Sequence, residues 1–123
     1  MRQIFAGILV LICVCLFGSV LVAENQMGIA DKYQVSFSEK VWVANTLLPK
    51  GNYEIRHIME GSDHIMVFRQ LGPKRPIEVR AKCTLVPLDA KATRNETAFT
   101  LNAADEHILH EMVFKGDRAK HVF

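Results

Sequence analysis

The side chains best suited to chemistry in this chain are its five histidines: His57, His64, His107, His110 and His121. A metal site needs three or four donor atoms that converge on one point. His107 and His110 are three positions apart, which places them on opposite faces of a strand. His121 approaches His110 only if the last two strands pair. The spacing favours structural or surface histidines, so we expect no metal ion and no cofactor.

Ser62, Asp63 and His64 are the three residue types of a hydrolase triad. In such triads the nucleophile, the base and the orienting acid converge from separated positions, which consecutive residues cannot do. A Gly-Ser-Asp sequence is also ordinary turn chemistry. We therefore predict a hairpin loop here, no catalytic residue, and a protein that is not an enzyme.

Cys83 lies in the stretch with the clearest two-residue alternation, residues 77–85. One face carries Ile77, Val79, Ala81, Cys83 and Leu85, and the other carries charged residues and a threonine. A reactive thiol requires an exposed, electropositive surrounding. The alternation instead predicts a small buried side chain in an apolar row.

The charge of the chain gives no sign of a nucleic-acid partner. It carries 15 basic and 13 acidic side chains, for a formal net charge of +2. The small basic stretch formed by Lys74, Arg75, Arg80 and Lys82 is interrupted by Glu78 and has no aromatic residues between its members. Nucleic-acid binders have a stronger basic footprint. We expect a solvated strand face.

The first 23 residues have the features of a secretory signal peptide. Arg2 precedes an apolar run over residues 4–17, and the segment closes on the small residue Ala23 before Glu24. We predict a signal helix over residues 1–23 and export to the periplasm or beyond. The alternative is an uncleaved membrane anchor, since 20 mostly apolar residues could just span a bilayer. Cleavage would leave Cys83 as the one thiol.

Residues 24–34 have no clear period and are expected to form a flexible leader. From residue 35 to 123, short alternating runs end at Gly, Pro, Asn or Asp, which is typical of strands. The expected strands are residues 35–38, 40–43, 52–58, 64–71, 76–88, 93–102, 107–115 and 118–123. We predict an all-β domain, an antiparallel β-sandwich of about seven to eight strands.

One hairpin can be aligned residue by residue. With a four-residue loop over residues 60–63, the opposite-charge pair of Glu54 and Arg69 lies on one face, and Ile55 and Phe68 lie on the other. The expected register pairs Met59 with His64, Ile58 with Ile65, His57 with Met66, Ile55 with Phe68, and Glu54 with Arg69. His57 and His64 are then diagonal neighbours.

Residues 48–55 read Leu-Pro-Lys-Gly-Asn-Tyr-Glu-Ile. Pro49 presets a turn that Gly51 can complete, so Leu48 should end one strand and Tyr53 should point inward from the next. This segment resembles the LPAGxYxV element of small exported bacterial β-sandwich-like proteins of uncharacterised function. A looser similarity runs to prealbumin-like and carboxypeptidase regulatory-like modules.

The chain ending, residues 110–123, is similar to the closing strand pair of that exported group. Lys50 stands where the group often has alanine, which the turn would tolerate. The resemblance implies a β-sandwich exported by a bacterium, and it brings no catalytic residue.

These observations predict a non-enzymatic exported binding or interaction module. Its partner would be another envelope or secreted protein that contacts an exposed edge strand, with residues 35–43 and 118–123 as candidate edges. Trp42, the one tryptophan, is a possible partner contact, although a core position is the favoured interpretation. The alternative function is a small-molecule or carbohydrate-binding sandwich. Membrane contact is expected only through an uncleaved N-terminal segment.

Overall fold

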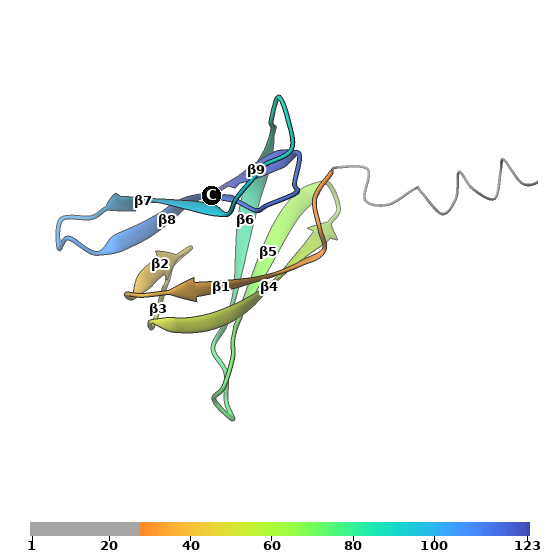
Figure 1. Cartoon of the computed structure of the whole chain (residues 1–123). Helices are drawn as coiled ribbons and strands as arrows, with labels where there is room; N and C mark the ends of the chain where they lie inside the picture. Colours follow the sequence, from red (N-terminus) through yellow and green to blue (C-terminus); the bar gives the residue numbers. More distant parts are fainter. Residues whose placement is uncertain (1–27) are drawn as a thin grey trace, which may run out of the picture.

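The computed structural model describes residues 28–123, which contain nine β-strands and no helix (Figure 1). The strands are β1 (Lys32–Phe37), β2 (Val41–Val43), β3 (Thr46–Leu48), β4 (Gly51–Glu60), β5 (Asp63–Gln70), β6 (Glu78–Pro87), β7 (Glu96–Leu101), β8 (His107–Val113) and β9 (Ala119–Val122). The all-β prediction is confirmed. The predicted signal helix lies outside the described residues, as do residues 24–27. Within residues 28–123, no helix is long and apolar enough to cross a membrane.

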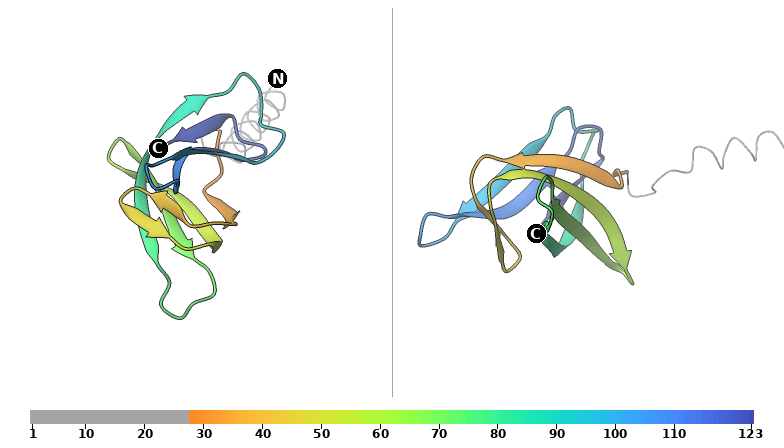
Figure 2. Two further views of the ribbon diagram at one scale, coloured as in Figure 1. Left: turned by 90° about the vertical axis from the view of Figure 1, so that its left-hand side faces the viewer. Right: turned by 90° about the horizontal axis from the view of Figure 1, so that it is seen from below.

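The strands form one connected sheet in the order β1-β4-β5-β6-β9-β8-β2-β3, with β7 attached to β8. Strand β6 joins the two halves, because its first part pairs with β5 and its last part pairs with β9 (Figure 2). The pairing of β2 with β8 is parallel, whereas we predicted an entirely antiparallel sheet. Strand β9 reaches only residues 111 and 112 of β8, so the start of β8 is left for the short β2–β3 hairpin.

Two details of the predicted strand pattern are wrong. The sheet has nine strands, because residues 46–48 form a separate strand, β3, which was not among the expected strands. A three-residue strand is too short to show alternation. Strand β1 begins at Lys32, so residues 32–34 of the predicted leader belong to the sheet.

Three local predictions are confirmed. Every pair of the predicted β4–β5 register is present, but the loop is shorter than the predicted four residues, because Glu60 and Asp63 also pair. On β6, Val79, Ala81 and Cys83 are buried, and the residues between them are exposed. The two ends of the predicted row differ, because Ile77 is exposed and Leu85 is only partly buried. At the predicted turn, Leu48 ends β3, and Tyr53 is buried with its hydroxyl donating to the carbonyl oxygen of Pro49 over 2.5 Å.

One hydrophobic core takes side chains from both halves of the sheet, from Tyr53 and Phe68 on one half to Leu109 and Met112 on the other. Ring contacts join elements that are not hydrogen-bonded neighbours. Tyr33 of β1 stacks on Phe114, just after β8, with the ring centroids 3.8 Å apart. The sheet therefore curls so that β1 lies across from the β8 end.

Candidate functional site

A polar cluster lies inside this core at the end where β1 begins. Three of its side chains, His57, Asp117 and His121, are the buried polar residues of the described chain. They are joined by Cys83, which is also buried, and by the partly exposed Tyr33 and His64. We call these six residues the polar cluster.

The pairing of four neighbouring strands brings the histidines and the cysteine together. His64 of β5 is the direct partner of Cys83 on β6. His57 of β4 pairs with Met66, which is two positions from His64 and on the same face. His121 of β9 pairs with Leu85, two positions from Cys83. Because paired residues share a face, all four side chains point toward the core.

Direct contacts link these side chains in two pairs. Nε2 of His57 lies 3.0 Å from Nδ1 of His64, so the diagonal approach expected from the register is a hydrogen bond. Sγ of Cys83 lies 3.9 Å from Nδ1 of His121. The rings of His57 and His121 face each other across the two pairs, with centroids 6.1 Å apart.

The other ring nitrogen of His121 faces Tyr33 and Asp117. Nε2 lies 3.4 Å from the Tyr33 hydroxyl and 3.8 Å from Oδ2 of Asp117. The Tyr33 hydroxyl donates to Oδ2 of Asp117 over 2.5 Å. Oδ1 of Asp117 accepts from the backbone N–H of Ala30 over 3.3 Å. The segment just before β1 thus closes this end of the core.

Burial decides the protonation of the cluster. It lowers the pKa of His121 to about 4, with His57 and His64 adding to the effect. It lowers the pKa of His57, with His64 adding to this and Asp31 opposing it. Burial also raises the pKa of the Cys83 thiol to about 11. At neutral pH the imidazole of His121 is neutral and the thiol keeps its proton.

The carboxyl and the phenol are shifted in the same direction. Burial raises the pKa of Asp117, against the lowering effect of the hydrogen bond from Tyr33. Burial and Asp117 together raise the pKa of Tyr33 far above its ordinary value. The hydroxyl therefore stays protonated and acts as the donor.

Cys83, His121 and Asp117 lie side by side in space, in the order of the nucleophile, base and acid of a catalytic triad. Cys83 lacks the activation that a nucleophile needs, because the thiol holds its proton far more tightly than the imidazole does. The thiol is also buried. As it stands in the structure, this thiol is not activated for nucleophilic attack.

In residues 28–123, no group of three or more His, Cys, Asp or Glu side chains is arranged to hold a metal ion. The two histidines of β8 lie outside the polar cluster. His107 contacts Glu39, with Nδ1 2.9 Å from a carboxylate oxygen, and His110 is exposed beside Glu111. Strands β8 and β9 do pair, but His110 points outward while His121 is buried, so the approach we considered does not occur.

The remaining residues considered from the sequence are Ser62, Asp63 and those of the basic stretch. Asp63, the first residue of β5, pairs with Lys82 over 3.2 Å, and Arg80 pairs with Glu60 over 2.6 Å. Two of the four residues of the basic stretch, Arg80 and Lys82, are therefore paired with acidic side chains. Ser62 is in the turn between β4 and β5, where the hairpin was predicted.

Tyr33 and Asp117 were missed by sequence reasoning. Tyr33 fell in the predicted leader, and Asp117 follows Gly116 in what reads as an ordinary turn. Their separation of 84 positions gives no periodic signal. Only the curl of the sheet brings them together.

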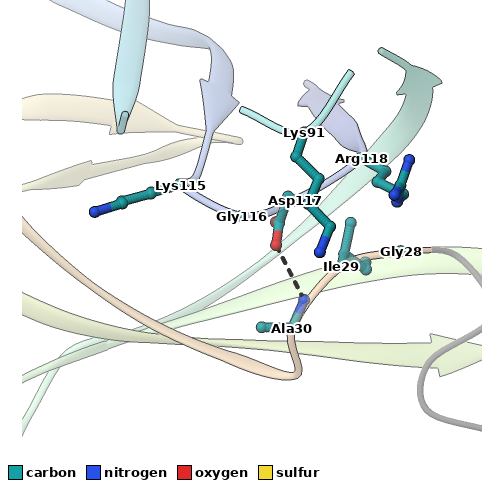
Figure 3. Close-up of a pocket in the computed structure, with 8 residues that line it drawn as sticks. All are labelled: Gly28, Ile29, Ala30, Lys91, Lys115, Gly116, Asp117 and Arg118. Atoms are coloured by element: carbon teal, nitrogen blue, oxygen red, sulfur yellow. Dashed lines mark hydrogen bonds between the residues drawn. The ribbon is translucent and has the colours of Figure 1, made fainter. Parts of the chain in front are cut away.

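A surface cavity of about 350 Å³ opens above Asp117 (Figure 3). Its lining includes Ala30, Lys91, Lys115, Asp117 and Arg118. Lys91 extends toward Asp117, while Lys115 and Arg118 point to opposite sides. The Lys91 side chain therefore points toward the Asp117 carboxylate, which already accepts hydrogen bonds from Tyr33 and Ala30.

Trp42 lies outside the core, contrary to the favoured interpretation. Its neighbours Val41 and Val43 are buried, and Trp42 is half-buried on the opposite face of β2. Nε1 donates to Oε1 of Glu106 over 3.1 Å. Ile108, its partner on β8, and Leu47, its partner on β3, are also partly exposed on this face.

Strand β7 differs from the other strands because all six of its residues are exposed. It pairs with β8 alone, so its other edge is open in the part of the chain that the structure describes. Phe99 and Leu101, exposed by 37% and 59%, are among its side chains.

Comparison of the chain with protein-family models, with curated proteins and with solved structures gave no match.

Proposed function

We propose that this chain is a non-enzymatic exported module that binds an extended segment of another envelope or secreted protein along the open edge of β7. The curled sheet would be a two-layer sandwich, in keeping with the resemblance to small exported β-sandwich-like proteins. Export rests on the signal-peptide features of residues 1–23.

The observation that carries the proposal is the complete exposure of β7. Proteins protect edge strands with charges, prolines or bulges. After Glu96, β7 has no charge and no proline. The register shift beside it leaves the extra residue, His110, on β8, so β7 itself keeps a regular edge. Such an edge can accept another strand.

A small cavity beside β7 supplies a place for one side chain of the partner. It has a volume of about 140 Å³, and its lining includes Phe37, Val41, Phe99 and His107. The rings of Phe37 and Phe99 lie 6.4 Å apart, and Phe99 meets His107 edge-on. We infer that the partner strand places an apolar side chain here. Backbone hydrogen bonds would give affinity and this contact would give selectivity.

The edges named from the sequence are only partly suited to this role. Strand β1 does lie at one end of the strand order. Strand β9 lies between β6 and β8, so residues 119–122 are no edge. Strand β2 lies between β8 and β3, which leaves Trp42 as a contact on the outer face rather than along an edge.

The test is cross-linked capture from envelope extract of the source organism, with the full chain as bait. Leu101→Lys places a charge on the apolar edge. Leu101→Pro removes a backbone donor of β7 that faces away from β8, since the N–H of the next residue, Asn102, bonds to Glu106 on the β8 side. Leu71→Lys is the matched control, since Leu71 is 40% exposed and lies after β5, away from β7. We expect the same partner with the wild-type chain and the control, and its loss with both β7 variants. Equal recovery with all four baits would exclude β7 as the binding edge.

Export is tested separately. We expect cell fractionation to place the protein outside the cytoplasm, and mass spectrometry to find a chain that begins at Glu24. Recovery of uncleaved chains in the membrane fraction would support the anchor instead, and cytoplasmic chains would contradict both.

A further inference from the structure

The polar cluster holds four side chains that bind soft and borderline metal ions: His57, His64, Cys83 and His121. They come from β4, β5, β6 and β9, which are consecutive in the strand order. The register places them on one face within two positions of one another. Three imidazoles and one thiol in a single row are a donor set that suits zinc or copper rather than magnesium or calcium.

The spacing within each pair is close to that of two ligands on one ion. Zn–N bonds of about 2.0–2.1 Å and Zn–S bonds of about 2.3 Å, in tetrahedral geometry, put neighbouring ligand atoms about 3.3–3.6 Å apart. The nitrogens of His57 and His64 are 3.0 Å apart, and Sγ of Cys83 is 3.9 Å from Nδ1 of His121. As the side chains stand, the two pairs do not converge on one point. Rotation of the ring of His57 toward His121, whose ring centroid lies 6.1 Å away, is what an ion would require.

The surroundings of His121 are a second, independent observation. A histidine that binds a metal ion usually directs its other ring nitrogen to a carboxylate, which fixes the ring and increases its basicity. Nδ1 of His121 faces Cys83, and Nε2 faces Tyr33 and Asp117. Tyr33 and Ala30 hold that carboxylate in place.

We propose that His57, His64, Cys83 and His121 form a binding site for one zinc-class ion. The site is a function beyond the strand-binding role of β7 and does not depend on it. Binding is a ligand substitution: the thiol of Cys83 loses its proton to solvent, and the thiolate and the imidazole lone pairs replace water molecules that the ion releases. Nothing is oxidised or reduced.

The test is zinc titration of the full chain by calorimetry after treatment with a chelator. Cys13→Ser and Cys15→Ser are present throughout, so that Cys83 is the one thiol. We expect one zinc per chain and the release of about one proton per zinc, which is measured as a dependence of the heat on the ionisation enthalpy of the buffer. Cobalt substituted for zinc should produce a thiolate charge-transfer band.

Single replacements locate the ion. Cys83→Ala should abolish the cobalt band and the proton release, and His121→Gln should weaken zinc affinity at least tenfold. Asp117→Asn should weaken zinc affinity by about 10–100-fold, because it removes the carboxylate that supports a metal-binding histidine. His110→Gln is the control, because His110 is exposed on the outer face, and we expect no change.

Two results would overturn the site: no zinc bound per chain, or zinc affinity that is equal in the wild-type, Cys83→Ala and His121→Gln chains. If a variant fails to fold, the wild-type chain still decides the question. Zinc should shift the imidazole NMR signals of His57, His64 and His121 and leave those of His107 and His110 in place. Shifts confined to His107 and His110 would also contradict the proposal.

Discussion

The indole Nε1 of Trp42 donates a hydrogen bond to Oε1 of Glu106 over 3.1 Å. Nδ2 of Asn102 donates to the same oxygen, and Lys40 pairs with the other carboxylate oxygen over 3.3 Å. One carboxylate thus connects β2 to the loop between β7 and β8. This contact explains why the one tryptophan is half-buried on the outer face although it lies outside the core.

The first prediction concerns the pH dependence of Trp42 fluorescence. The hydrogen bonds from Trp42 and Asn102, with Lys40, hold the pKa of Glu106 below its ordinary value of 4.5. A lowered pKa means that this contact is complete above pH 4.5 and is lost as the pH falls through the lower value. We expect a fluorescence transition with its midpoint below 4.5, absent in Glu106→Gln. A midpoint above that value would show that the carboxylate does not accept from the indole.

The second prediction separates the core from β7. Phe68 is completely buried, so Phe68→Ala should reduce the free energy of unfolding by about 3–5 kcal/mol. Phe99 is partly exposed on β7, and Phe99→Ala should cost about 1 kcal/mol or less. Urea unfolding measures both changes. Equal losses would mean that β7 is part of the core and would weaken its proposed role as an open edge.

Local patterns in the sequence predicted the parts of the fold that depend on neighbouring residues. Alternation along residues 77–85 gave the buried row of Val79, Ala81 and Cys83, and charge pairing gave the register of Glu54 with Arg69. Both follow from a two-residue period and from the contact of directly opposed side chains.

The long-range arrangement could not be predicted in this way. Tyr33 and His121 are separated by 88 positions, and they meet because β6 pairs with both halves of a curled sheet. The parallel pairing of Trp42 with Ile108 depends on how far β9 extends along β8. Neither the separation of Tyr33 from His121 nor the extent of β9 affects the local periodicity of the sequence. The polar cluster could therefore be identified only in the structure.

The third prediction uses two glycines that both have a positive φ, 69° at Gly28 and 61° at Gly61. An L residue in this region costs about 1–2 kcal/mol, and Gly61→Ala should cost no more, because its Cβ meets nothing within 4 Å. At Gly28 the added Cβ would lie 2.9 Å from Cβ of Arg118. That clash adds about 1–3 kcal/mol. Thermal or urea unfolding should show the larger loss for Gly28→Ala. Equal losses would mean that Gly28 does not pack against Arg118.

The last prediction concerns the hydrogen bond from Tyr33 to Asp117, and it compares two tyrosines. Tyr33→Phe keeps the ring that stacks on Phe114 and removes only the hydroxyl. Loss of a hydrogen bond to a buried charged group should cost about 1.5–3 kcal/mol at neutral pH. Tyr53→Phe removes a hydroxyl that donates to an uncharged carbonyl, and it should cost about 0.5–1.5 kcal/mol.

The pH dependence distinguishes the two variants. Burial raises the pKa of Asp117 above the ordinary value of 3.8, so the folded state is favoured while the carboxyl is protonated and loses that advantage as the pH rises through the raised pKa. Tyr33 offsets this loss by donating to the carboxylate. The cost of Tyr33→Phe should therefore be largest at pH 7 and should shrink below pH 3.8, whereas the cost of Tyr53→Phe should stay constant. Urea unfolding with a chelator present measures both, and a cost of Tyr33→Phe that is independent of pH would show that Asp117 does not ionise in the folded chain.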